Sequence, residues 1–179
     1  MSRHSQRRKR EAILACLAML ILCSLVLAQD TEKRGPSTAE ERKRFLEITR
    51  KMADSPLDPA LRADRDWALK WLIAVPDINV DVCNEPLGDF VNAQYKYTPQ
   101  ILGQLTFSTG AFIIEHPDKA KDRGASYVAG TEGALHAYQS ILKTEPDAKV
   151  KELDDLLEKQ KQGKLADFVR TACKSDQQG

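Results

Sequence analysis

From residue 38 onward, apolar residues recur with the period of an α-helix, interrupted by proline and glycine. Thr38 followed by Glu41 forms a capping box, in which a hydroxyl and a carboxylate accept hydrogen bonds from free amides at a helix start. A first helix is therefore expected over residues 39–53, and its few apolar positions place it on the outside of the domain. An Asp-Pro pair repeats the start signal and precedes a second, well-buried helix over residues 59–75.

The segment after this second helix has a different pattern. Pro76 ends the helix, and residues 78–82 alternate apolar and polar side chains before Cys83. Such alternation is typical of a short strand. The chain offers no second segment for it to pair with, so we expect an extended connection. A short helix over residues 86–95 is expected to follow.

The second half of the chain predicts further helices. One begins at residue 98 and ends before Pro117, and its apolar residues cover nearly the whole circumference, which is typical of a helix in the middle of a core. Amphipathic patterns then predict helices over 124–143, 146–161 and 165–172, with Gly163 at a left-handed position between the last two. The fold class is therefore all-α, with five to seven helices.

This pattern also defines the domain organisation. The helices form a single compact domain over residues 38–173, a length sufficient to bury an ordinary core. Residues 29–37 are polar, contain Gly35-Pro36 and are interpreted as a linker. Residues 174–179 are interpreted as a polar tail.

The first 28 residues are organised as a leader. Five basic residues precede an uncharged apolar run of 17 residues, from Ala12 to Ala28. This length lies between that of a signal peptide and that of a membrane span. Val26 and Ala28 place small side chains where signal peptidase requires them, so residues 1–28 are a cleaved signal peptide or, alternatively, an N-terminal membrane anchor. Both place the domain outside the cytoplasm, periplasmic or secreted, with residues 12–28 as the only membrane contact.

Setting the leader aside changes the charge. The whole chain has a formal net charge of +1, and the leader holds five basic residues against Glu11, so residues 29–179 carry −3. Their Lys and Arg residues are interleaved with Asp and Glu and form no stripe for a phosphate backbone. We therefore expect no nucleic-acid partner.

Two cysteines follow the leader, Cys83 in a connection and Cys173 at the end of the last predicted helix. In an oxidising compartment they are expected to form a disulfide. A catalytic thiol or two buried free cysteines are the alternatives. A catalytic cysteine requires a paired histidine, and no local Cys/His signature is present.

The remaining candidate chemistry is sparse. Glu115, His116 and Asp118 gather at a helix end, where they are weak candidates for a hydrolase site, although a histidine there also suits the helix dipole. His136 follows Glu132 by one helical turn, and a solvated ion pair is a simpler interpretation than a metal site, because zinc requires three or four protein ligands. No phosphate-binding loop is present. No metal and no cofactor are therefore predicted.

One segment resembles a known repeat. Ala134, Tyr138, Ile141 and Pro146 are spaced as in the second helix of a tetratricopeptide repeat, over about 13 of 179 residues. The pattern occurs once, whereas a repeat array needs about three copies to bury its faces. The resemblance implies a helical-hairpin binding surface.

Two functions follow as hypotheses. The first is an exported helical binding or interaction module, whose partner is a protein, a peptide or a small ligand. The second is a small extracytoplasmic hydrolase using Glu115, His116 and Asp118. Catalysis requires an acid, a base and a stabilising group to converge. The sequence motifs needed for this are missing, which favours binding.

Overall fold

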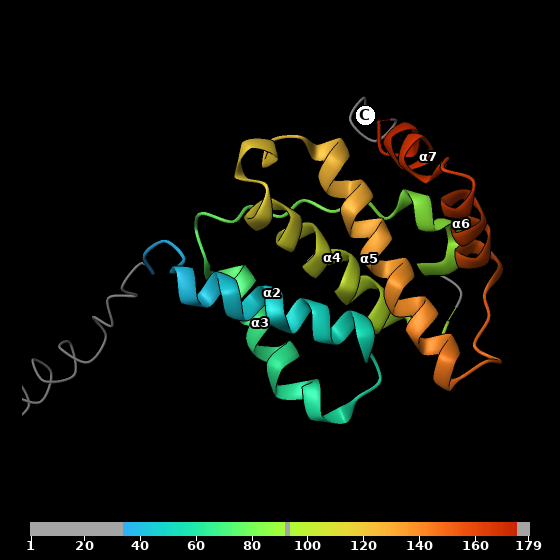
Figure 1. Ribbon diagram of the computed structural model, residues 1–179, viewed down its shortest axis with the longest axis horizontal. Helices are drawn as coiled ribbons and strands as arrows, with labels where there is room; N and C mark the ends of the chain where they lie inside the picture. Colours follow the sequence, from blue (N-terminus) through green and yellow to red (C-terminus); the bar gives the residue numbers. More distant parts are fainter. Residues whose placement is uncertain (1–33, 92–93, 175–179) are drawn as a thin grey trace, which may run out of the picture. The chain divides into compact units, whose positions relative to one another are not determined.

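The computed structural model describes residues 34–91 and 94–174, which belong to one compact unit (Figure 1). Over these residues it contains six α-helices and three short 3₁₀ segments, and no strand. The all-α prediction is therefore confirmed. The expected leader, residues 29–33 of the linker and residues 175–179 of the tail lie outside the described residues. The α-helices are α2 (Ala39–Asp54), α3 (Arg62–Ala74), α4 (Thr98–Glu115), α5 (Arg123–Thr144), α6 (Lys151–Lys161) and α7 (Leu165–Ala172).

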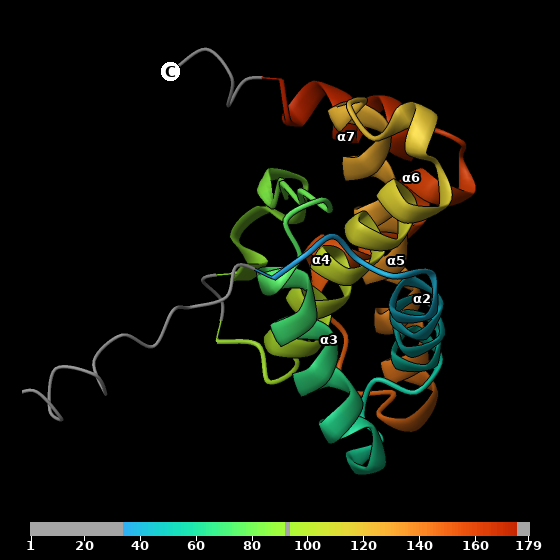
Figure 2. The ribbon, with the colours of Figure 1, turned by 90° about the vertical axis from the view of Figure 1, so that its left-hand side faces the viewer.

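Helices α4 and α5 lie side by side along most of their length (Figures 1 and 2). α2 packs against both of them, α3 packs against α2 and α4, and α6 and α7 pack against α5. α4 contributes to two hydrophobic clusters: Ile101 and Leu105 to one, shared with α5, α6 and α7, and Phe107 and Ile113 to another, shared with α2 and α3. The position of α4 in the middle of the core is therefore confirmed, as the apolar residues on nearly all sides of this helix predict.

The start of α2 shows how the sequence fixes a helix end. The Glu41 amide donates to the Thr38 hydroxyl (3.2 Å), and the Thr38 amide donates to the Glu41 carboxylate (2.9 Å), so the predicted capping box is present. This bond to the Thr38 amide is the main cause that lowers the pKa of Glu41. The helix lies at the edge of the domain, with Phe45, Ile48 and Met52 buried. α2 is thus held by its capped end and by one apolar face.

Some predicted boundaries are wrong. The second helix is divided into a 3₁₀ turn, Pro59–Leu61, and α3. The short helix expected at 86–95 is a 3₁₀ segment, Glu85–Val91, interrupted at Gly88 by a positive φ of 61°. The segment 78–82 is an extended connection, as expected.

The start of α6 differs most, because it begins at Lys151 rather than at residue 146. The buried Tyr138 hydroxyl accepts a hydrogen bond from the Val150 amide (2.9 Å) and donates one to Asp154 (2.8 Å). These bonds hold Val150 in an extended conformation, with φ −140° and ψ 131°. A tertiary contact therefore sets the start of α6, and the residues next to it in the sequence do not indicate that contact.

A disulfide joins Cys83 to Cys173, with their Cα atoms 6.0 Å apart. It ties the end of α7 to the connection after α3, as predicted. Disulfides of this kind are typical of an oxidising, extracytoplasmic setting. Within residues 34–91 and 94–174, no helix combines the length and the apolar character needed to cross a membrane.

Candidate functional site

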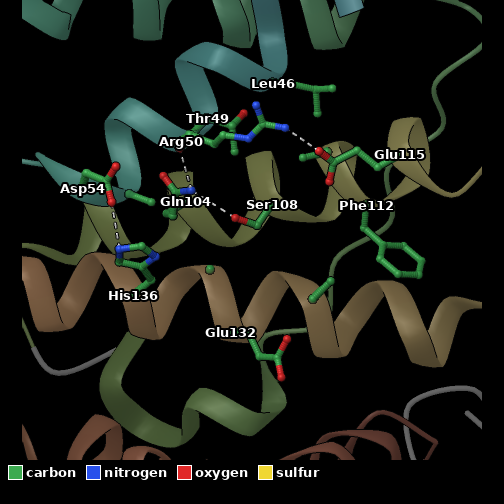
Figure 3. Close-up of a pocket in the computed structure, with 14 residues that line it drawn as sticks. Leu46, Thr49, Arg50, Asp54, Gln104, Ser108, Phe112, Glu115, Glu132 and His136 are labelled. Atoms are coloured by element: carbon green, nitrogen blue, oxygen red, sulfur yellow. Dashed lines mark hydrogen bonds and ion pairs between the residues drawn. The ribbon is translucent and has the colours of Figure 1, made fainter. Parts of the chain in front are cut away.

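A groove of about 360 Å³ lies between α2, α4 and α5 (Figure 3). One stripe of α4 forms its floor, and α2 and α5 form its two rims. Its lining combines apolar residues, buried polar residues and charged residues at the rims. The lining residues are Leu46, Thr49, Arg50, Ala53 and Asp54 of α2; Gln104, Ser108, Ala111, Phe112 and Glu115 of α4; and Ala129, Glu132, Gly133 and His136 of α5.

Small residues on α5 shape this groove. A Cβ atom on Gly133 would overlap the side chain of Ser108, and one on Gly130 would overlap the hydroxyl of Thr109. The absence of side chains at these two positions lets the α5 backbone approach α4 closely. Because Ala129 and Gly133 have little or no side chain, α5 does not cover the α4 residues that form the base of the groove.

The floor contains a buried amide with an unmet hydrogen-bonding need. Gln104 is 1% exposed, and its Nε2 donates to the Thr49 carbonyl (3.1 Å) and to the Ser108 hydroxyl (3.0 Å). A carbonyl oxygen only accepts hydrogen bonds, so the Gln104 nitrogen must face Thr49, which fixes the amide orientation. The Gln104 Oε1 atom is then buried without a protein partner. An unsatisfied buried acceptor of this kind costs about 1–3 kcal/mol.

Two ion pairs link α2 to α4 and to α5 at the groove (Figure 3). Arg50 of α2 pairs with Glu115 of α4 at 2.7 Å, and His136 of α5 pairs with Asp54 of α2 at 2.9 Å. All four side chains are substantially exposed, and such pairs contribute about 0.2–1 kcal/mol each. Glu132 is exposed on the α5 rim and has no hydrogen-bond or ion-pair partner among the described residues.

The expected pairing of His136 with Glu132 is therefore wrong. The two residues do share one solvent-facing side of α5, as the helical spacing predicts. However, Asp54 reaches the imidazole from α2. The geometry of a single helix does not include this neighbour, because it comes from a segment about 80 residues earlier in the chain.

The three candidate hydrolase residues are divided by the structure. Glu115 lines the groove and pairs with Arg50, whereas His116 and Asp118 are exposed and do not line it. His116 is the C-terminal cap of α4, and its ring lies 4.7 Å from the ring of Phe112. The structure therefore brings only one of these three residues into a concave site.

The disulfide region is the one metal-like cluster within the described residues. Cys83, Glu85 and Cys173 place potential ligand atoms within 4.8 Å of one another, and a Glu85 carboxylate oxygen lies 2.7 Å from the Cys83 sulfur. Both sulfurs are bonded to each other, so neither is a thiolate that could bind a metal. The cluster as it stands is a structural cross-link.

Sequence reasoning missed the main residues of the groove. Gln104 and Ser108 are one turn apart on a helix that otherwise has the composition of a core helix. Two polar residues at this spacing within an apolar helix are the signal that was available. The tetratricopeptide-like positions Ala134, Tyr138 and Ile141 are all fully buried, so they form core rather than a binding surface.

Comparisons of the chain with protein-family models, with curated proteins and with solved structures found no match.

Proposed function

We propose that this chain is an exported helical binding module that takes a small ligand in the α2/α4/α5 groove. The observation that carries the proposal is Gln104, which lines that groove and whose Oε1 atom is a buried acceptor without a protein partner. A ligand that donates a hydrogen bond there would recover the cost of burying this oxygen.

The size and the lining of the groove support a small ligand over a protein partner. Its volume of about 360 Å³ falls in the range of small-molecule sites, which combine apolar walls with a few convergent polar groups. The three helices that form the groove pack directly against one another, so the groove is largely formed before a ligand arrives.

The location outside the cytoplasm rests on two features. The basic leader with its apolar run is typical of export. The disulfide between Cys83 and Cys173 is typical of an oxidising compartment. Alkaline phosphatase fused after Ser37 should be active in a bacterium. An inactive fusion that is demonstrably made would contradict export, and mass analysis of the N-terminus would distinguish cleavage after Ala28 from an anchor.

Ligand binding is tested by a saturation-transfer NMR screen of a small-fragment library against the purified protein. We expect a subset of fragments to bind, and Ala129→Leu to abolish that binding because the larger side chain fills the groove. Ala63→Leu is the matched control, since Ala63 is exposed on α3 and does not line the groove. Fragments that bind the Ala129→Leu variant as well as the wild-type protein would refute the groove as the site.

A further inference from the structure

We infer that the groove selects a ligand with a primary ammonium group on a short apolar body. This inference rests on the proposed function and adds the chemical class of the ligand. The groups that carry it are the free acceptors of the groove, its charges and its apolar walls.

Two hydrogen-bond acceptors of the groove have no protein partner in the part of the chain that the structure describes. Gln104 Oε1 is buried and unpartnered, and the Glu132 carboxylate has no partner among the described residues. A carboxylate accepts hydrogen bonds and cannot donate them when ionised. An ammonium group has three donors and no acceptor, so it complements this set.

The charges of the groove lining also favour a cationic ligand. Three carboxylates line the groove, Asp54, Glu115 and Glu132, against one guanidinium and one imidazole. Both basic groups are already engaged, Arg50 by Glu115 and His136 by Asp54. An anionic ligand would have to displace one of these carboxylates, whereas a cation meets the unpaired Glu132 directly.

The rest of the lining is apolar and suits a hydrocarbon portion. Leu46 and Ala53 contribute from α2, Ala111 and Phe112 from α4, and Ala129 from α5. Phe112 is partly exposed, and its ring face is itself attractive to a cation. The combination of acceptors and an apolar wall favours an alkylammonium over a fully polar ligand such as a sugar.

The test compares three probes of equal length but different head groups: pentylammonium, pentanol and pentanoate. Their binding to the full-length protein is measured by isothermal titration calorimetry at pH 7 and low salt. We expect pentylammonium to bind about five- to tenfold more tightly than pentanol, and pentanoate to bind most weakly. Added salt should reduce the preference for pentylammonium, because the charges are exposed.

The variant Glu132→Gln should weaken the binding of pentylammonium much more than that of pentanol, and so remove most of this preference. Its side chain is exposed and unpaired, so the substitution does not disturb folding. Glu145→Gln is the matched control, because Glu145 is exposed and does not line the groove. In this control, the preference should persist.

Two outcomes would overturn the inference and leave the proposed function intact: pentanol or pentanoate binding as tightly as pentylammonium, or an ammonium preference that survives Glu132→Gln. Absence of binding by all three probes up to millimolar concentrations would also overturn it. In that case, the fragment screen and its Ala129→Leu variant decide separately whether the groove binds ligands of another class.

Discussion

Removing the disulfide between Cys83 and Cys173 should destabilise the domain strongly without changing its helices. The bond joins residues 90 positions apart, and the chain-entropy model assigns a loop of this length about 4.6 kcal/mol at 25 °C. For a domain of about 140 residues, this corresponds to a fall in melting temperature of about 15 °C. Circular dichroism at low temperature should still show native helix content, because both hydrophobic clusters remain.

Thermal unfolding of four proteins tests this: the wild type, Cys83→Ser, Cys173→Ser and the double variant. Each single variant should match the double variant, because either substitution removes the same bond. Dithiothreitol should lower the melting temperature of the wild type and leave that of the double variant unchanged. A single variant with the wild-type melting temperature under oxidising conditions, or single effects that add in the double variant, would refute the reasoning.

Three further predictions concern the helices around the groove. Gly133→Ala should destabilise the protein by about 1–3 kcal/mol in urea unfolding, because its Cβ would overlap α4, whereas Gly103→Ala, with no atom nearby, should stabilise it by about 0.5–1 kcal/mol. Tyr138→Phe removes the hydroxyl that holds the start of α6 and should cost about 1–3 kcal/mol by the same measurement; equal stability would show that the two hydrogen bonds contribute nothing. The pKa of Glu41 is lowered in the folded protein, so the stabilisation by the capping box is complete above the ordinary Glu pKa of 4.5 and is lost as pH falls through the lower folded pKa. In acid unfolding, the stability of Glu41→Gln should therefore depend less on pH below about 4.5 than the stability of the wild type.

Local signals in the sequence predict much of this fold. The Thr38–Glu41 capping box, Pro117 after α4 and Gly163 after α6 mark helix ends through interactions within a few residues, and all three are found. The disulfide was predictable because only two cysteines, Cys83 and Cys173, follow residue 28. Such features depend on neighbours along the chain, which the sequence displays directly.

The groove depends on contacts between distant segments. Asp54 reaches His136, and Arg50 reaches Glu115, only after α2 has packed across α4 and α5. No pattern of neighbouring residues in the sequence indicates either of these two ion pairs. The orphaned oxygen of Gln104 likewise results from the Thr49 carbonyl, 55 residues earlier, which takes the amide nitrogen. A contact with a residue outside the helix also sets the start of α6, because the Val150 amide donates to the hydroxyl of Tyr138, 12 residues earlier.

The central claim is that the α2/α4/α5 groove binds a small ligand, and an NMR chemical-shift map tests it most directly. The assigned ¹H–¹⁵N spectrum of the protein is recorded with increasing amounts of the tightest-binding fragment from the screen. The account predicts saturable shifts in the amides of residues 46–54, 104–115 and 129–136, with the side-chain amide of Gln104 among the largest. Shifts confined to α3, α6 or α7, with these three segments unchanged, would contradict it.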